Sequence, residues 1–400
     1  MIVSHCRNLA HRAAVVERPF AVRFMSDNKR KGVFVAGTMQ HHGKTTITLG
    51  LTHALLKQGR RVAYQKPVGQ QTVPVECNGK ILEVDRDVDV FKHMWPQLVG
   101  SFADCSPVAF PPAFTRHVLD GKETAENLRE RCVSSFERLV NDAEYVVVEG
   151  TGHIGVGSIV GLNNAQVASA LGLECVMVVP GGLGNSFDLL TVNLAMLDKY
   201  GVKLKGVIVN KVDPTKIDMV RHYYAKAMES LGAPVLGVVP LDPTLGLVSF
   251  RDIVRILKAR VLTCPQHDLR SFMHTRLIIS TATDVGRIRP GSLLVVNIAR
   301  MDLVGLLLEQ HRQAKKEGTD LKGGVILVGP EKPPADILKG LEEQGLPSAW
   351  IQKEDYDGTG YRMLAKVIVH TPKFLRSDMP RLVRACEHVS QHIDLDRIVA

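Results

Sequence analysis

The sequence predicts an α/β fold, in which a parallel P-loop sheet with helices on both faces precedes a smaller α/β domain. Short Val- and Ile-rich runs alternate with helical patterns, as in parallel sheets that are covered by helices. A glycine-containing turn followed by Lys44 and Thr45 joins the first run to the first helix. The strands are expected at 32–37, 61–68, 145–150, 173–180, 204–212 and 233–240, and the helices at 45–58, 123–141, 185–200 and 215–231.

The rhythm of strands and helices changes after residue 240, which predicts a domain boundary. We expect the first domain at 32–244, a linker region at 245–274 and the second α/β domain at 275–400. The second domain is expected to have strands at 275–280, 291–298, 323–329 and 347–352, and helices at 300–316, 334–344 and 378–393.

Composition excludes several classes of function. With 45% hydrophobic and 23% charged residues, the 400-residue chain resembles an ordinary globular protein, and it has no apolar run long enough for a membrane span. Residues 1–31 carry +5 of the net charge of +9, so the remaining chain is nearly balanced and nucleic-acid binding is not expected. Seven widely spread cysteines without a CxxC pair predict reduced thiols and no zinc site.

The segment 1–31 is rich in arginine, poor in acidic residues and dotted with apolar side chains. This composition is typical of a mitochondrial presequence, so we expect the protein in the mitochondrial matrix, and in the cytoplasm otherwise. A disordered or tag-like N-terminus is the alternative interpretation.

The segment 37–46, GTMQHHGKTT, is the candidate phosphate site. Five residues separate its two glycines, one more than in the common G-x-x-x-x-G-K-[ST] pattern. Backbone N–H groups of such a loop cradle phosphates, the lysine neutralises β- and γ-phosphate oxygens, and the threonine binds Mg²⁺. A tight strand-to-helix turn is the alternative. The candidate nucleotide ligands in the loop are Gly37, Thr38, His42, Gly43, Lys44, Thr45 and Thr46.

The longer loop resembles that of dethiobiotin synthetase and its relatives, which reads G-T-D-T-x-x-G-K-T. Four later segments follow the same family in order: YQKPVGQQ (64–71), DVDVF (87–91), VVVEGTGHIGVGS (146–158) and VIVNKVDP (207–214). The resemblance implies a Mg²⁺–nucleotide site at the carboxyl ends of the strands, which is where ligands bind in such sheets.

Four residues outside the loop are candidate site residues. The resemblance implies that Lys66 holds a γ-phosphate or a substrate carboxylate; an exposed lysine beside a turn is the alternative. Glu149 ends an apolar strand, where a carboxylate can reach Mg²⁺. Asp89 is preferred to Asp87 as a second metal ligand. Asn210 is expected to pair with the base, and because NKVD also resembles a guanine-reading segment, GTP stays open beside the favoured ATP.

The loop departs from the dethiobiotin synthetase pattern at Gln40, His41 and His42, and VGQQT (68–72) replaces a small, serine-containing substrate turn. The two histidines either contact a different acidic ligand or merely fill the loop. The departures therefore concern the acceptor substrate and leave the nucleotide expectation intact.

The C-terminal region resembles the DRTGG domain that follows a similar P-loop domain in long bacterial phosphate acetyltransferases. The resemblance is carried by residues 289–310, 324–363 and 370–374, although NIARMD (297–302) replaces the DRTGG signature itself. The sequence stops where the acetyltransferase domain of that family begins, so acetyl transfer is not expected.

Two classes of function remain. In the first, an ATPase or ligase-like enzyme transfers a phosphoryl group to a small acidic metabolite, with Lys44 and Lys66 catalytic and with Thr45, Asp89 and Glu149 holding Mg²⁺. In the second, a regulatory or scaffold protein of mitochondrial metabolism senses the nucleotide. The expected partners in either class are the nucleotide and a second copy of the chain.

Overall fold

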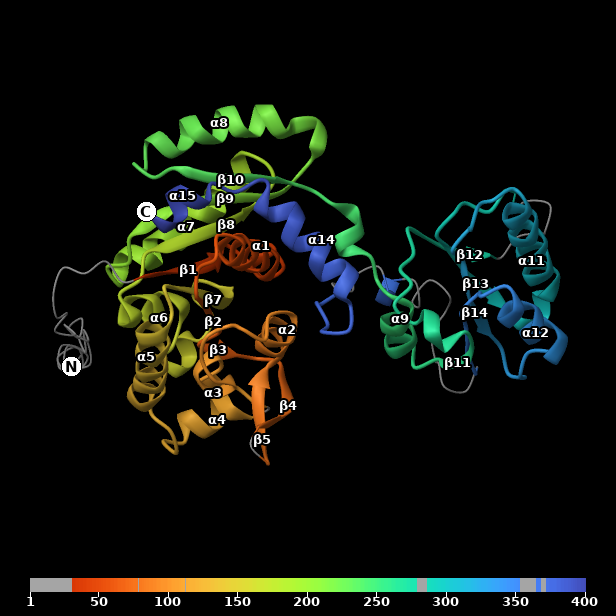
Figure 1. The fold of residues 1–400 in the computed structure, drawn as a ribbon, viewed down its shortest axis with the longest axis horizontal. Helices are drawn as coiled ribbons and strands as arrows, with labels where there is room; N and C mark the ends of the chain where they lie inside the picture. Colours follow the sequence, from red (N-terminus) through yellow and green to blue (C-terminus); the bar gives the residue numbers. More distant parts are fainter. Residues whose placement is uncertain (1–30, 78, 112, 279–285, 353–364, 368–371) are drawn as a thin grey trace, which may run out of the picture. The chain divides into compact units, whose positions relative to one another are not determined.

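The computed structural model describes residues 31–77, 79–111, 113–278, 286–352, 365–367 and 372–400. These residues form two compact units (Figure 1). The first contains the described residues up to Pro240 together with Cys386–Ala400, and the second is Leu241–Ala385. The expected presequence lies outside the described residues except for Lys31, as do parts of the segments 324–363 and 370–374.

A six-stranded parallel sheet forms the centre of the first unit, in the order β10-β9-β8-β1-β7-β2. Its central strands are buried on both faces, as their continuous Val and Ile content predicts. β1 lies between β7 and β8, so the loop after β1 leaves the sheet where its connections change direction. The strands are β1 (Gly32–Gly37), β2 (Val62–Gln65), β7 (Tyr145–His153), β8 (Cys175–Pro180), β9 (Leu204–Val212) and β10 (Val235–Pro240).

Helices connect these strands and cover the sheet (Figure 1), which confirms the predicted fold class. Polar side chains start two of them: Thr124 caps one helix, and Asn163 forms a capping box with Gln166 in the next. The connecting helices are α1 (Lys44–Lys57), α5 (Ala125–Asp142), α6 (Asn164–Leu171), α7 (Gly184–Lys199) and α8 (Ile217–Glu229).

The stretch between β2 and α5 contains elements that the sequence analysis did not predict. An antiparallel hairpin, β4 (Thr72–Cys77) with β5 (Lys80–Asp85), leads into α2 (Arg86–Met94). The Asp85 side chain accepts a hydrogen bond from the Asp87 N–H and so starts α2. Shorter elements complete the stretch: β3 (Val68–Gly69), α3 (Phe102–Cys105), β6 (Val108–Ala109) and α4 (Phe114–Leu119).

The C-terminal residues pack in the first unit, whereas the sequence analysis assigned them to the second domain. α14 (Met379–Ser390) carries the chain back, and α15 (Leu395–Val399) follows it. Ile393 pairs with Gly237 of β10, and the Tyr145 hydroxyl donates a 3.0 Å hydrogen bond to the Ile398 carbonyl. Ile398 is also buried, so its apolar side chain adds to the hydrophobic core of the first unit.

The second unit is built on a five-stranded sheet in the order β11-β15-β14-β13-β12, in which only β11 is antiparallel to its neighbour. Apolar side chains of the strands and helices form its cores. The residues expected to form a linker, 245–274, supply α9 and β11 and thus belong to this unit. The elements are β11 (Arg260–Thr263), β12 (His274–Ile278), β13 (Ser292–Asn297), β14 (Gly324–Val328), β15 (Ser348–Ile351), α9 (Phe250–Leu257), α11 (Met301–Lys316) and α12 (Ala335–Glu343).

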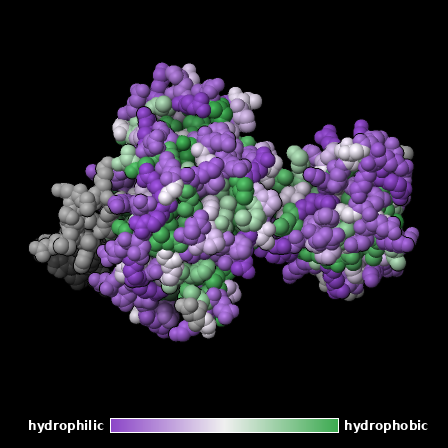
Figure 2. Space-filling model, in the orientation of Figure 1, coloured by the Kyte–Doolittle hydropathy of each residue, from purple (hydrophilic) through white to green (hydrophobic). Residues whose placement is uncertain are grey.

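Hydrophilic side chains dominate the visible surface of each unit, with smaller apolar areas between them (Figure 2). Among the helices of the described residues, none has both the length and the apolar character needed to cross a membrane.

Candidate nucleotide site

The loop between β1 and α1 depends on its two glycines. Gly43 has φ +93°, and a Cβ there would lie 2.2 Å from the side-chain Nδ2 of Asn210. A Cβ at Gly37 would approach the Lys44 side chain to 3.1 Å. The glycines therefore allow both the turn into α1 and the close packing of Lys44 over the loop.

Three side chains from two other elements, α7 and β9, hold the loop in place. Asn193 of α7 donates to the Thr38 carbonyl at 3.2 Å. At the end of β9, Asn210 donates to the His42 carbonyl at 2.9 Å, and the Lys211 ammonium donates to the His41 carbonyl at 2.8 Å. The loop is thus preorganised. The side-chain N–H of Asn210, the residue expected to pair with the base, contributes to this by holding the loop.

His42 is neutral in this environment. Burial lowers its pKa to about 4, helped by the positive charges of Lys44 and Lys211. Its Nδ1 lies 2.9 Å from the Thr38 hydroxyl, so a hydrogen bond fixes the ring across the loop. At neutral pH, His42 therefore adds a polar ring but no charge to the loop.

The start of α1 is suited to an anion. Its first turn contains no acidic residue, and no side chain caps it. Backbone N–H groups at such a terminus carry partial positive charge, which the buried Lys44 beside them reinforces. Thr46 lies in the same turn, as expected.

Glu149 is the centre of the site. Its carboxylate is buried near the end of β7 and accepts hydrogen bonds on both oxygens. Oε1 accepts from the Thr45 hydroxyl at 2.7 Å and from the Lys66 ammonium at 3.1 Å. Oε2 accepts from the hydroxyls of Thr48 at 2.7 Å and Tyr64 at 2.8 Å. The four donors orient the carboxylate and compensate its desolvation.

Lys66 lies among three carboxylates. It contacts Glu149, forms an ion pair with Asp87 and lies 3.8 Å from Asp85. Burial alone would lower the pKa of Lys66, but Asp85, Asp87 and Glu149 raise it well above its usual value. Burial raises the pKa of Asp85 from 3.8 to about 6 despite the opposing charge of Lys66. This buried cluster therefore contains three carboxylates and one ammonium group.

The donor set fits Mg²⁺. The Thr45 hydroxyl and Glu149 Oε1 are adjacent hard oxygen atoms beside the phosphate-binding loop, and oxygen ligands from a few side chains plus phosphate are what Mg²⁺ prefers in proteins. The surplus of negative charge around Lys66 also favours a divalent cation. Thr45 and Glu149 are the residues that would hold the ion.

The structure brings most of the expected site residues together. Glu149 contacts both Thr45 and Lys66, and Lys44 is the residue next to Thr45 in α1. Asp89 is buried in the first turn of α2, but the carboxylates that contact Lys66 come from Asp85, Asp87 and Glu149.

Sequence reasoning missed three participants: Thr48, Tyr64 and Asp85. Thr48 follows Lys44 by one helical turn, so the helix period could have placed it on the same face. Tyr64 and Lys66 lie two residues apart at the end of β2, and Asp85 precedes the acidic run of α2 as its N-cap. Recognising the start of α2 would have identified Asp85.

Fold and site together define a P-loop nucleotide-binding protein with a parallel sheet. The AAA domain family AAA_26 matches residues 31–249, and the chain belongs to this family. Relatives of the chain include dethiobiotin synthetases, which are named as ATP-dependent.

Relatives match different shares of the chain. The ATP-dependent dethiobiotin synthetase BioD of Pseudomonas aeruginosa is 32% identical over 211 residues, which cover 52% of this chain and 88% of the relative. The phosphate acetyltransferase of Nitrosomonas europaea is 25% identical over 384 residues, covering 92% of this chain and 51% of the relative. The chain thus spans about half the length of the phosphate acetyltransferases that it matches. Among solved structures, the MinD cell division protein of Aquifex aeolicus matches with a TM-score of 0.35 and 17% identity, covering 54% of this chain and 84% of that one.

The raised pKa of Asp85 predicts a pH-dependent stability of the first unit. The folded unit holds this proton more tightly than the unfolded chain, so the contribution is present below pH 3.8 and is lost as pH rises through about 6. Asp85→Asn, which keeps an N-cap, should flatten the dependence of unfolding free energy on pH by up to about 3 kcal/mol.

Urea unfolding between about pH 4 and 7 measures this effect. A Trp350→Phe background leaves Trp95 as the tryptophan reporting on the first unit, since the chain has two. Asp218→Asn, at an exposed position on α8, is the control and should leave the slope unchanged. An equally steep slope in the Asp85→Asn variant would contradict the assignment.

Proposed function

We propose that the protein is a Mg²⁺- and ATP-dependent enzyme that transfers the γ-phosphoryl group to water or to a small acidic acceptor, as an ATPase or ligase-like enzyme. The observation that carries the proposal is the contact of Glu149 Oε1 with both Thr45 and Lys66 at the end of the phosphate-binding loop. A site that only retained nucleotide would not need a buried lysine beside the metal-ligand pair.

The residues have distinct tasks in this proposal. The first turn of α1 and Lys44 bind the phosphates, and Thr45 with Glu149 hold the ion. Bound Mg²⁺ neutralises charge that develops on the transferred group. The positive charge of Lys66 lies beside this metal site. The neighbouring carboxylates of Asp85, Asp87 and Glu149 keep Lys66 protonated and fix its position.

ATP is favoured over GTP by two observations. The similar dethiobiotin synthetases are named as ATP-dependent. In the NKVD segment, the Lys211 ammonium is engaged by the His41 carbonyl, and Asp213 Oδ1 accepts from the N–H and hydroxyl of Thr215. These groups already have partners that a guanine ring would have to replace.

An acidic acceptor is supported by Arg86, the first residue of α2. Its Nη2 donates to the Gln71 side chain, in the segment that departs from the dethiobiotin synthetase pattern. Its Nε is buried without a hydrogen-bond partner among the described residues. A carboxylate or phosphate on the acceptor would satisfy this donor.

Lys44→Ala should weaken Mg²⁺–ATP binding by about 10- to 100-fold, since it removes a charge-assisted contact to the phosphates. Isothermal titration calorimetry on the full chain measures the change. Lys57→Ala, at the exposed end of the same helix, is the matched control and should bind as the native chain does. Unchanged affinity in Lys44→Ala would exclude this loop as the phosphate site.

Glu149→Gln should reduce nucleotide turnover by about 100-fold or more while the protein stays folded. The amide can turn its oxygen toward Thr45 and Lys66 and donate to the oxygens of Thr48 and Tyr64, so the substitution removes charge and keeps shape. ATP consumption is followed in the presence of a mixture of small carboxylic acids. Equal turnover by the native chain and the Glu149→Gln variant would favour nucleotide sensing over catalysis.

We propose further that the protein assembles with a second copy of itself and that the second unit is a DRTGG-like domain.

We also propose that residues 1–31 direct the protein to the mitochondrial matrix. The arginine-rich, acid-poor composition of 1–31 supports mitochondrial import. A fluorescent fusion of the full chain should colocalise with a matrix marker, and a fusion beginning at residue 32 should not. Identical distributions of the two fusions would refute import.

A further inference from the structure

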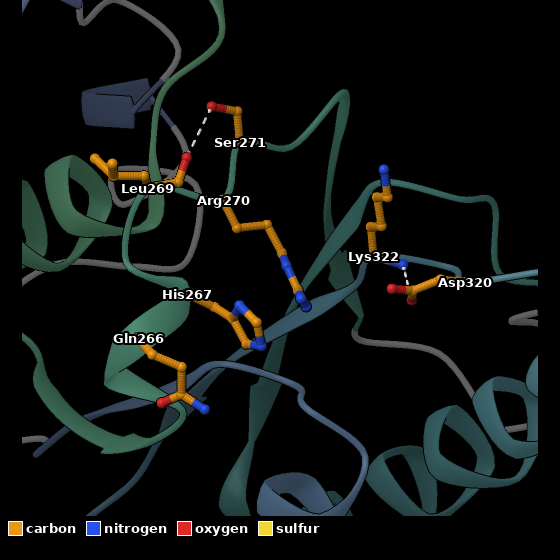
Figure 3. Close-up of a pocket in the computed structure, with 7 residues that line it drawn as sticks. All are labelled: Gln266, His267, Leu269, Arg270, Ser271, Asp320 and Lys322. Carbon is orange, nitrogen blue, oxygen red and sulfur yellow. Dashed lines mark hydrogen bonds between the residues drawn. The ribbon is translucent and has the colours of Figure 1, made fainter. Parts of the chain in front are cut away.

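A pocket of 380 Å³ opens within the second unit (Figure 3). It is lined by side chains from two segments, 266–271 and 320–322. The first segment follows β11 and overlaps the short helical turn Pro265–His267, and the second precedes β14. All of its lining residues belong to one compact unit.

The pocket lies at the amino ends of the parallel strands. The residues that hold it together, Gly323 and Gly345, come shortly before β14 and β15. Ligands of α/β sheets usually bind at the opposite, carboxyl edge. This pocket is therefore a different place from the turn 297–302, which follows β13 at the carboxyl edge.

Arg270 is fixed by its backbone contacts. Its Nη1 donates to the carbonyls of Gly323 and Gly345, each at 2.9 Å. The hydrogen bonds that Arg270 makes within the described part of the chain use no other atom of the guanidinium. The Nε and Nη2 edge is therefore available, and this edge matches the two oxygens of a carboxylate or phosphate.

The neighbouring side chains favour an anion. In Figure 3 the guanidinium points between His267 and Lys322. Burial and then Arg270 lower the pKa of His267, so its ring is neutral at pH 7. The carboxylate of Asp320 already accepts from the Lys322 N–H at 2.8 Å and faces His311 at 3.1 Å. Arg270 and Lys322 thus outweigh the one lining carboxylate.

We propose that this pocket is a second binding site, which takes a small metabolite through a carboxylate or phosphate group held on the Nε–Nη2 edge of Arg270. Its volume lies within the usual range for small-molecule sites, about 300–1,000 Å³, so the ligand extends beyond the anionic group. Lys322 adds charge, and His267 and Gln266 supply neutral polar contacts along the pocket.

The test uses the full chain carrying Lys44→Ala, so that the loop of the first unit does not compete for phosphate. Amide NMR spectra are recorded during titration with inorganic phosphate and, separately, with acetate. Saturable shifts of the Lys322 and Gly323 N–H signals are expected with one of the two probes below about 50 mM. Saturation by phosphate alone identifies a phosphate ligand, and saturation by acetate alone a carboxylate ligand.

Substitutions then show whether ligand binding depends on the two-atom edge of the Arg270 guanidinium or only on positive charge. Arg270→Lys keeps the positive charge but loses the two-atom edge and should weaken binding by about tenfold. Lys322→Gln leaves the contacts of Arg270 with the two carbonyls intact and should weaken binding about threefold. Lys316→Gln, exposed at the end of α11, is the control and should bind normally.

The proposal is overturned if neither probe shifts these signals, or if Lys322→Gln and Arg270→Lys both bind as the parent does. If Arg270→Lys fails to fold, Lys322→Gln together with His267→Ala decides the question, because neither side chain contributes a hydrogen bond within the described residues. Because the parent already carries Lys44→Ala, the outcome is independent of nucleotide binding in the first unit.

Discussion

The buried carboxylate of Glu149 is the constraint on which the nucleotide site depends. An ionised carboxylate in this position is costly unless its oxygens are satisfied. Four donors satisfy it, and they come from α1, β2 and the residue that follows β2. The same hydrogen bonds therefore fix the start of α1 relative to the ends of β2 and β7, which are the parts that surround a bound phosphate.

Charge in this region is unequally distributed. Lys66 faces three carboxylates, so the cluster without a ligand is short of positive charge, whereas the loop beside it offers Lys44 and a helix N-terminus. The loop therefore suits an anionic phosphate, and the carboxylate cluster around Lys66 suits a divalent cation. A nucleotide with its metal supplies both, which explains why the two kinds of charge lie next to each other.

The sequence was most informative where one physical signal dominated. β1 and β9 have the predicted bounds because continuous Val and Ile runs between polar turns specify buried strands. Thr45 follows the first of these strands by a short loop and Glu149 lies near the end of another, so the sequence could place both at the same edge of the sheet. The β4–β5 hairpin was missed because its half-buried residues lack a long periodic run. Asp85 was missed for a related reason: its contact with Lys66 depends on where α2 begins. The return of the C-terminus was also missed, since tertiary packing alone assigns α15 to the first unit.

This return makes the second unit an insertion in the chain of the first. The segment Cys386–Ala400 includes the strand partner of Gly237 and the carbonyl that Tyr145 contacts. During synthesis, the first unit therefore lacks part of its own structure until this segment has left the ribosome. The second unit is complete in sequence before that moment, so the order in which the two can finish folding is the reverse of their order of appearance in the chain.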